Sequence, residues 1–152
     1  GKAWHLFATH TASFDTDEAR RLRQIQFGQI RTLAASLEIP ASDTVIYGGD
    51  FNVNKRKFAD DYAGMLANLN ADEPVYGGYT EATFDPRLNP YAGGPLSGGA
   101  NVEYLDYLVV SREYGAVRHN LNRVWIPRSS DGSLWPASNL SDHFPVKGEI
   151  SR

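Results

Sequence analysis

Two short apolar runs, with an amphipathic stretch between them, dominate the N-terminal part of the chain. Residues Trp4–Thr9 and Thr44–Gly49 are apolar and β-prone over the length of a strand, so each predicts a buried strand. Apolar residues recur at helical spacing from Glu18 to about Leu37, which predicts a helix that ends before Pro40, because proline cannot continue it. The expected apolar positions of this helix are Leu22, Ile25, Ile30, Leu33, Ala34 and Leu37, and its expected solvent-facing arginines are Arg20, Arg21, Arg23 and Arg31.

The rest of the chain predicts one more helix and several strands around a long loop. The helix is expected over Phe58–Leu69, with one apolar face formed by Phe58, Tyr62, Met65, Leu66 and Leu69. The stretch Asp72–Asn101 is rich in Gly, Pro, Asn and Tyr, and it predicts a long irregular loop of the kind that is usually functional or disordered. Strands are expected over Glu103–Val110 and Phe144–Ile150, and Val117–Ile126 has room for a further one.

Composition restricts the class of protein. The chain has 152 residues, which suits one domain, and 41% of them are hydrophobic, which excludes disorder of the whole chain. The absence of cysteine excludes a disulfide scaffold and a cysteine-ligated zinc site. No apolar run approaches the ~18 residues that a membrane span needs.

Charge and the first residues restrict it further. With 15 Lys+Arg against 18 Asp+Glu, the net charge is −3, so the chain lacks the broad positive field of a tight nucleic-acid binder. This disfavours DNA binding but leaves open an enzyme that acts on a single phosphodiester. The sequence begins Gly1-Lys2-Ala3, with no initiator methionine and no signal peptide, so we expect a mature, trimmed or truncated product.

Residues with acid–base or ligand chemistry lie at or beside the ends of the predicted strands. They are His10, Asp50, Asn52, Asp106, Asp142 and His143. Functional sites are commonly built where strand ends of a rigid sheet converge. Asp50 and Asn52, two positions apart, can share a side, and a carboxylate with an amide can hold a hard cation or a phosphate oxygen. The alternative is an Asx turn that ends the strand.

The two histidines of this set also have alternatives. Asp142 and His143 are adjacent and face opposite ways on a strand, so a separate carboxylate, Asp106, is the candidate partner of the His143 imidazole. Asp106 lies in an apolar strand and needs a partner, which a backbone amide or a tyrosine could equally supply. For His10 the alternative is a packed histidine at a strand end.

Four motifs in order carry a family resemblance. They are Thr9-His10, Gly48-Gly49-Asp50-Phe51-Asn52-Val53, Tyr104-Leu105-Asp106-Tyr107 and Ser141-Asp142-His143-Phe144-Pro145-Val146. Together they resemble the C-terminal half of the endonuclease/exonuclease/phosphatase superfamily. This implies an α+β, four-layer α/β/β/α sandwich of the DNase-I-like fold. Residues 1–152 would be the C-terminal half of such a domain, and its strands would supply about one of the two sheets.

A narrower resemblance comes from the segments between these motifs. Asn52-Val53-Asn54-Lys55, Tyr62 to Asn70, Tyr76-Gly77-Gly78, Thr83-Phe84-Asp85-Pro86 and Asn89 resemble the bacterial Mg-dependent sphingomyelinase C group. The resemblance implies a phosphodiesterase that hydrolyses sphingomyelin to ceramide and phosphocholine. A nuclease or another phosphodiesterase of the same fold, or a non-catalytic membrane-binding module, is the alternative.

The resemblance also implies roles for residues. His143 would be the general base, oriented by Asp106, and His10 would contact the phosphate and act as general acid. Asp50 and Asn52 would position water, phosphate and metal-bound solvent. The implied metal is Mg²⁺, with Mn²⁺, Co²⁺ or Ca²⁺ as alternatives, and Asp142, Asp50 and Asn52 are its implied ligands. In-line attack on a phosphodiester needs these functions: an activated water, neutralised oxygens and a protonated leaving group.

The same resemblance implies partners outside the chain. Family members are about twice as long, so we expect a missing N-terminal half that supplies further metal ligands. We also expect a sphingomyelin membrane surface as partner, no nucleic acid, and a secreted bacterial protein. Trp125 and Trp135 flank a polar turn and are the candidates for membrane contact, with packing against the sheet as the alternative. Lys55, in the basic run before Phe58, is the candidate for phosphate binding, with a solvated turn as the alternative.

Overall fold

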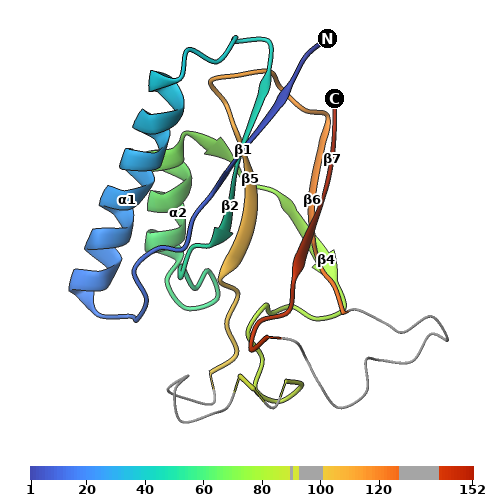
Figure 1. Ribbon diagram of the computed structural model, residues 1–152. Coiled ribbons are helices and arrows are strands. Elements are labelled where there is room, and N and C mark those ends of the chain that lie inside the picture. The colour runs from blue at the N-terminus through green and yellow to red at the C-terminus, as the bar shows by residue number, and fades with distance from the viewer. Residues whose placement is uncertain (90, 93–100, 127–140) are drawn as a thin grey trace, which may run out of the picture.

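The computed structural model describes residues 1–89, 91–92, 101–126 and 141–152, which contain two helices and seven strands (Figure 1). In chain order they are β1 (Trp4–Ala8), α1 (Asp17–Ser36), β2 (Thr44–Asp50), α2 (Ala59–Leu69), β3 (Ala71–Asp72), β4 (Val75–Gly78), β5 (Asp106–Ser111), β6 (His119–Val124) and β7 (Val146–Ser151).

The strands form two sheets. The first has the order β1-β2-β5-β3, in which β1 is parallel to β2 and β5 is antiparallel to it. The second has the order β4-β6-β7, in which β4 is parallel and β7 antiparallel to β6. Figure 1 shows both helices on one side of the first sheet and the second sheet on its other side. The chain thus has the mixed sheets and helix-covered face expected of part of a DNase-I-like sandwich.

The core lies between the helices and the first sheet. Alternate residues of β2, Val45 and Tyr47, point to this side and are fully buried with Phe27 of α1 and Met65 of α2. The predicted apolar face of α2 is therefore confirmed: Met65 and Leu69 are buried, and its partly buried tyrosine and leucine pack against the same core.

Helix α1 differs from its prediction in which residues it buries. Arg23, expected in solvent, is fully buried, because its guanidinium pairs with Asp61 at 2.8 Å and donates to the carbonyl oxygens of Ala12 and Phe14. Four expected apolar positions of α1 are instead exposed: Leu22, Ile25, Leu33 and Leu37. The buried residues of α1 are Arg23, Phe27 and Ala34. The periodicity therefore predicts the helix correctly, but the face that it assigns to the core is rotated from the one that is buried.

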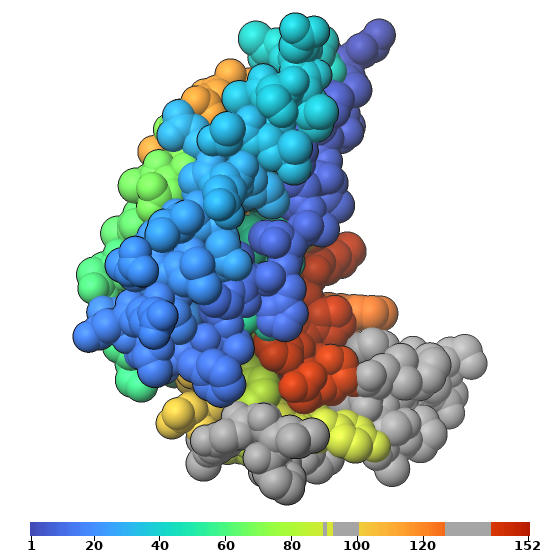
Figure 2. All heavy atoms as spheres, turned by 60° about the vertical axis from the view of Figure 1, so that its left-hand side comes forward, coloured from blue at the N-terminus to red at the C-terminus, as the bar shows by residue number. Residues whose placement is uncertain are grey.

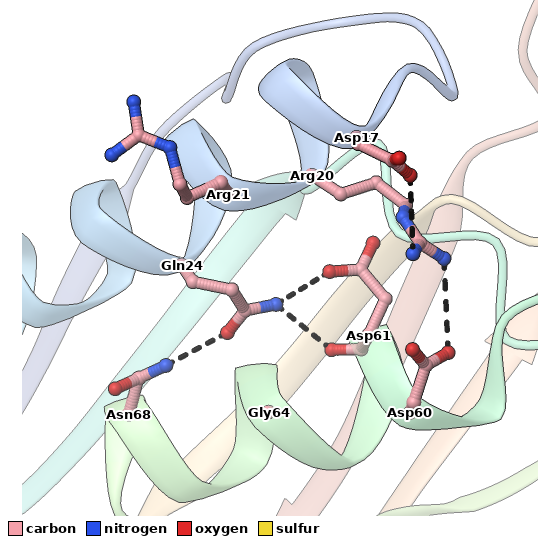
Figure 3. A pocket seen from close by; sticks show the side chains of 8 residues that line it. All are labelled: Asp17, Arg20, Arg21, Gln24, Asp60, Asp61, Gly64 and Asn68. Atoms are coloured by element: carbon pink, nitrogen blue, oxygen red, sulfur yellow. Dashed lines mark hydrogen bonds and ion pairs between the residues drawn. The ribbon is translucent and has the colours of Figure 1, made fainter.

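A polar contact joins α1 to α2 (Figure 3). Gln24 donates to both the carboxylate and the backbone carbonyl of Asp61, and it accepts a hydrogen bond from Asn68. Gly64 leaves room for this amide, since a Cβ there would lie 2.9 Å from the Gln24 side-chain oxygen. These residues line a polar groove of about 460 Å³. Its polar character follows from the side chains that form the hydrogen bonds between the two helices.

Asn122 of β6 joins the two sheets. It is fully buried, accepts a hydrogen bond from the backbone N–H of Leu108 in β5, and donates to the carbonyl of the same residue. The side-chain amide therefore substitutes for a neighbouring strand at that point of β5. Because β6 and β7 pair with β4 and not with a strand of the first sheet, the chain contributes strands to two sheets. The prediction that it supplies about one sheet is therefore wrong.

Two other predictions need correction. The stretch Asp72–Asn101 is not wholly irregular, since β3 ends and β4 lies within it, and parallel pairing to β6 supplies the hydrogen bonds of β4. The strand predicted from Glu103 begins only at Asp106, because Leu105 bonds outside the ladder to Thr83 and Phe51. Within the described residues, no helix is both long and apolar enough to cross a membrane.

The two ends of the sequence meet on one face of the molecule. In Figure 2 the red atoms of the C-terminal residues lie beside the dark blue atoms of the N-terminal segment. Ion-pair distances agree, since histidines from both segments lie near the carboxylate of Asp50.

Candidate active site

Strand pairing places two carboxylates opposite each other. Asp50, the last residue of β2, is the register partner of Asp106, the first residue of β5. Like charges in directly opposed positions destabilise an antiparallel pair, so sheet formation does not explain them. Burial and, next, the charge of Asp106 raise the pKa of the Asp50 carboxyl above its ordinary value.

His143 lies between these carboxylates. Its Nδ1 is 2.8 Å from a carboxylate oxygen of Asp106, and its Nε2 is 3.8 Å from a carboxylate oxygen of Asp50. The ring packs edge-on against Phe84, with 5.3 Å between ring centroids. Burial disfavours the imidazolium, but the hydrogen bond and charge of Asp106, with the charges of Asp50 and Asp142, outweigh it and raise the pKa of His143 to about 9.

The end of β1 brings His10 to the same place. Beyond β1 the parallel ladder continues, because the N–H of Thr9 donates to the carbonyl of Gly48 and the N–H of Thr11 donates to that of Asp50. His10 lies between these two bonds, and its Nε2 is 3.3 Å from the Asp50 carboxylate. Its side chain is 70% exposed, so the alternative of a packed histidine does not describe it.

Gly49 makes this junction possible. Its φ is +129°, in the region that favours glycine, and a Cβ there would overlap the carbonyl oxygen of Thr9. The sequence therefore needs glycine immediately before Asp50 so that the strand carrying His10 can lie close.

Asn52 is held beside these residues. Its side-chain nitrogen donates to the carbonyl of Thr11 at 3.0 Å, and its backbone N–H donates to the Asp50 carboxylate at 2.9 Å. The latter bond is the Asx turn named as the alternative reading, so Asp50 ends its strand with an Asx turn and also faces both histidines.

The remaining predicted residues are not among the converging groups or lie outside the described part. Asp142 is exposed and its charge acts on the adjacent His143, but its carboxylate is not among the three ligand groups that converge. The charged neighbours of Lys55 are Glu73, Arg56 and Glu81, not the carboxylates of the cluster. Trp125 is 49% exposed, so it does not have the packed position of the alternative reading. Trp135 lies outside the described residues.

Thr83 links both halves of the His143–Asp106 pair and was given no role from the sequence. It is fully buried, and its hydroxyl accepts hydrogen bonds from the N–H groups of Leu105 and Asp106. Its carbonyl accepts the N–H of Phe144, next to His143. The signal available beforehand was its place in a motif of the family resemblance.

Asn89 holds the segment that carries His143. It is fully buried, and its side-chain nitrogen donates to the carbonyls of Ser141 and Asp142. Asn89 is itself fixed by a turn in which its N–H donates to the carbonyl of Asp85, 2.8 Å away. Asn89 was named for the family resemblance, but nothing in the sequence showed that it would hold the segment before His143.

The carboxylate cluster suits a hard cation. One ligand atom from each of Asp50, Asp106 and His143 lies within 4.8 Å of the others. Burial and the charge of Asp106 raise the pKa of Asp50 despite the Asn52 N–H and the two histidines, and a divalent cation would favour its ionised form. Mg²⁺ prefers oxygen ligands, so Asp50, Asp106 and the Asn52 amide fit it better than the imidazole, whose Nδ1 is already hydrogen bonded.

Known proteins share both the sequence and the fold of this chain. It is 32% identical over 97% of its length to a phospholipase C of Staphylococcus aureus and, likewise, to a sphingomyelinase C of Listeria ivanovii. The chain spans about half of these relatives, 46% of each. No family model matches the chain.

Solved structures extend the comparison. A crystal structure of Staphylococcus aureus beta toxin superimposes with a TM-score of 0.80 at 30% identity, covering 96% of this chain and 52% of the toxin chain. Another beta toxin structure, which contains bound magnesium ions, has a TM-score of 0.77 at 29% identity and covers 94% of this chain and 51% of its own. The chain is thus a homologue of the bacterial sphingomyelinases C and phospholipases C, with their fold, over about half of their length.

Proposed function

We propose that the chain is the C-terminal half of a magnesium-dependent phosphodiesterase of the sphingomyelinase C type. Such an enzyme hydrolyses sphingomyelin to ceramide and phosphocholine. The observation that carries the proposal is the convergence of His143, Asp106, Asp50 and His10, from four separate segments, on one edge of the sheet. Structural needs do not explain this cluster, since it sets two carboxylates side by side.

The general base in this proposal is His143, which must be neutral to accept a proton. Without a cation the neighbouring carboxylates raise its pKa to about 9, and a bound divalent cation would offset their charge and so favour the neutral imidazole. Asp106 accepts the proton on Nδ1 at 2.8 Å, which fixes the tautomer and leaves Nε2 to take a proton from the attacking water. Thr83 and Asn89 keep the two partners in place through the backbone, and they are positioning residues because neither faces the cluster.

The phosphate would lie between His143 and His10. His10 is exposed beside Asp50, so its imidazolium can donate to a phosphate oxygen and protonate the leaving alkoxide. Asp50, Asp106 and Asn52 would hold the cation, with Asp142 as a further carboxylate nearby. When bound, the cation offsets the charge of the carboxylates and of the phosphate oxygens.

The lipid substrate and the location of the enzyme belong to the same proposal. We expect a protein secreted by a bacterium that acts at the membrane surface, with Trp125 and Trp135 in contact with the lipid. The exposure of Trp125 supports the first of these contacts, because exposed tryptophan favours the membrane–water interface. Nucleic acid is not an expected partner of this acidic chain.

The test uses the full-length protein and sphingomyelin vesicles. We expect phosphocholine release in the presence of Mg²⁺, its loss in EDTA, and a fall of at least about 10²-fold for His143→Ala, the usual size of a general-base contribution. The control is His119→Ala, which removes an exposed histidine at the start of β6 and should leave turnover unchanged.

Two other outcomes would replace this function. Cleavage of DNA or another phosphodiester, lost in His143→Ala while sphingomyelin stays intact, would make the protein a different phosphodiesterase of the same fold. Vesicle binding that resists EDTA, with no turnover of any phosphodiester, would make it a membrane-binding module.

A further inference from the structure

A polar cleft lies between the loop that follows β2, the segment that contains β4, and the residues just before β5. Its volume is about 510 Å³, and it is lined by Lys55, Arg56, Tyr76, residues 77–81 and Tyr104. We call it the Lys55 cleft. It has no lining residue in common with the cluster around His143, so its function is a separate question.

Lys55 is the unusual charge in this cleft. Its ammonium nitrogen lies 3.4 Å from the ring centroid of Tyr76 and 4.9 Å from that of Tyr104. Its two basic neighbours have carboxylate partners, Arg56 with Glu81 and Lys57 with Asp15, whereas Lys55 makes no ion pair within the described part of the chain. Burial lowers the pKa of Lys55 although the charges of Glu73 and Glu81 oppose this, which agrees with an ammonium that is partly desolvated and has no carboxylate in direct contact.

Tyr104 supplies the second observation. Only 2% of the residue is exposed, and its hydroxyl has no hydrogen-bond partner among the described residues. The two neighbouring tyrosines are satisfied: Tyr76 bonds to the Tyr62 hydroxyl, and Tyr107 donates to the carbonyl of Val53. A buried hydroxyl without a partner costs about 1–3 kcal/mol, so a wall residue that keeps one suggests an external acceptor.

The chemistry of the lining selects an anion. Lys55 already occupies the faces of the two tyrosine rings, so the cleft does not offer them to a ligand cation. What remains are donors: the ammonium of Lys55, the hydroxyl of Tyr104 and the hydroxyl of Thr80, with the only lining carboxylate, Glu81, paired to Arg56. Phosphate oxygens accept from just this set of groups.

We propose that the Lys55 cleft binds a phosphate group, with Lys55 and Tyr104 as its donors, at a site separate from the proposed catalytic centre. A neighbouring hollow of about 310 Å³ shares Gly78 and Tyr79 with the cleft and continues to Trp125. Tyr79 and Trp125 are both exposed, so an anionic phospholipid could place its phosphate in the cleft and its glycerol region against these rings. Free phosphate shares the same donors.

The first experiment titrates inorganic phosphate into the full-length protein in EDTA and follows binding by calorimetry. Lys55→Met keeps the apolar stem and removes the charge, and we expect its affinity to fall at least about tenfold, the value of a charged hydrogen bond. Tyr104→Phe removes only the unpartnered hydroxyl, so affinity should fall severalfold without loss of thermal stability. Lys147→Met, which removes an exposed lysine paired with Glu149, is the control and should bind like the wild type.

A second experiment separates the sources of the phosphate. Vesicles of phosphatidylcholine, with or without about one fifth phosphatidylglycerol, are sedimented with the same proteins. Stronger binding to the anionic vesicles that Lys55→Met and Tyr104→Phe both weaken assigns the site to a lipid headgroup. Weakening confined to inorganic phosphate assigns it to the free ion.

The proposal is overturned if both variants bind inorganic phosphate and anionic vesicles as well as the wild type does. That result would leave the proposed catalytic function untouched, since neither Lys55 nor Tyr104 contacts the cluster around His143. Conversely, a protein with no phosphodiesterase activity that still binds phosphate through Lys55 would retain this site.

Discussion

At the scale of single residues, side chains that do no chemistry hold the site together. Thr83 satisfies the backbone on both sides of the His143–Asp106 pair, through its hydroxyl at Asp106 and its carbonyl at Phe144. From the loop between β4 and β5, this one residue therefore fixes the start of β5 and the loop before β7 relative to each other.

Thr83→Val tests this role, because valine has the same shape but no acceptor. Leaving the buried N–H groups of Leu105 and Asp106 unpaired should cost about 1–3 kcal/mol of unfolding free energy. We expect kcat on sphingomyelin to fall about tenfold or more, because the variant misplaces the His143–Asp106 pair. KM should change little, because the contacts that bind the lipid are not altered. Thr83→Ser, which keeps the hydroxyl, should restore kcat; a mutant with normal kcat and reduced stability alone would refute a positioning role.

The His143–Asp106 pair also predicts how stability depends on pH. The pKa of His143 is raised from 6.5 to about 9 in the folded chain, so the folded state holds this proton more tightly than the unfolded state does. The contribution of the pair to stability is therefore complete below pH 6.5 and is lost as pH rises through about 9. The total is on the order of 3 kcal/mol.

The measurement is chemical denaturation in EDTA, comparing the wild type with His143→Gln across pH 6 to 10, a range that brackets the two pKa values. The difference in unfolding free energy between the two proteins should shrink between pH 6.5 and about 9. A difference that stays constant over this range would show that the imidazole is not protonated preferentially in the folded state.

At the scale of elements, the junction of β1 and β2 decides the geometry of the site. The two strands run parallel, and the carbonyl oxygen of Thr9 lies where a Cβ of residue 49 would be. Only glycine at this position therefore allows the 3.3 Å approach of His10 Nε2 to the Asp50 carboxylate.

Gly49→Ala should therefore separate these strands. The positive φ alone costs about 1–3 kcal/mol in a residue with a side chain, and the overlap with Thr9 adds to it. Gly28→Ala is the matched control, since Gly28 lies inside α1 with nothing within 4 Å of its Cβ position and should gain about 0.5–1 kcal/mol in helix propensity. Thermal melts of both variants check this pair, and equal stabilities would contradict the role of Gly49.

The elements also show what can be predicted from the sequence. Strand β2 and helix α2 follow from local pattern, because their apolar residues match the period of the element and face the core. Strand β1 was also predicted, but its predicted burial is wrong, since Trp4 and Leu6 are exposed and its apolar run does not show which face is covered. Helix α1 was predicted with the wrong buried face, since nothing in periodicity reveals that Asp61 and two loop carbonyls will hold Arg23 inside. Strand β4 was missed because its short, glycine-rich sequence forms a strand only when β6 pairs with it.

The candidate site, too, could be predicted from the sequence only in part. The polar residues at strand ends identified the cluster, and the resemblance named His143 and Asp106 as partners, which lie 2.8 Å apart. Their catalytic roles stay predictions. Thr83, Asn89 and Tyr104 belong to segments that carry the resemblance, but their contacts run through backbone bonds or burial, which depend on the tertiary structure and cannot be predicted from the pattern along the chain.

At the scale of the whole molecule, the first sheet is uncovered at β1, on the side away from the helices. Phe7 of β1 packs toward the helices, so Leu6, which alternates with it, points to the other side, and it is 63% exposed. Trp4 lies two residues away on the same side and is also exposed. Because the relatives are about twice as long as this chain, we propose that an N-terminal half covers this face.

Residues 1–152 alone should then self-associate and lack full activity. We expect sedimentation velocity to show concentration-dependent association that Leu6→Lys reduces, because exposed apolar patches drive association. Leu33→Lys changes an exposed leucine on α1, on the helical side of the sheet, and should leave the association as it is. A monomeric, fully active fragment would contradict the proposal.

The cluster around His143 joins groups that are far apart in the sequence. His10, from the segment after β1, and His143, from the loop before β7, both lie near the Asp50 carboxylate. Local detachment of either segment would separate these groups while the core between the helices and the first sheet stays folded. A protein that keeps its secondary structure and its thermal transition can therefore still have lost the arrangement of its reactive groups.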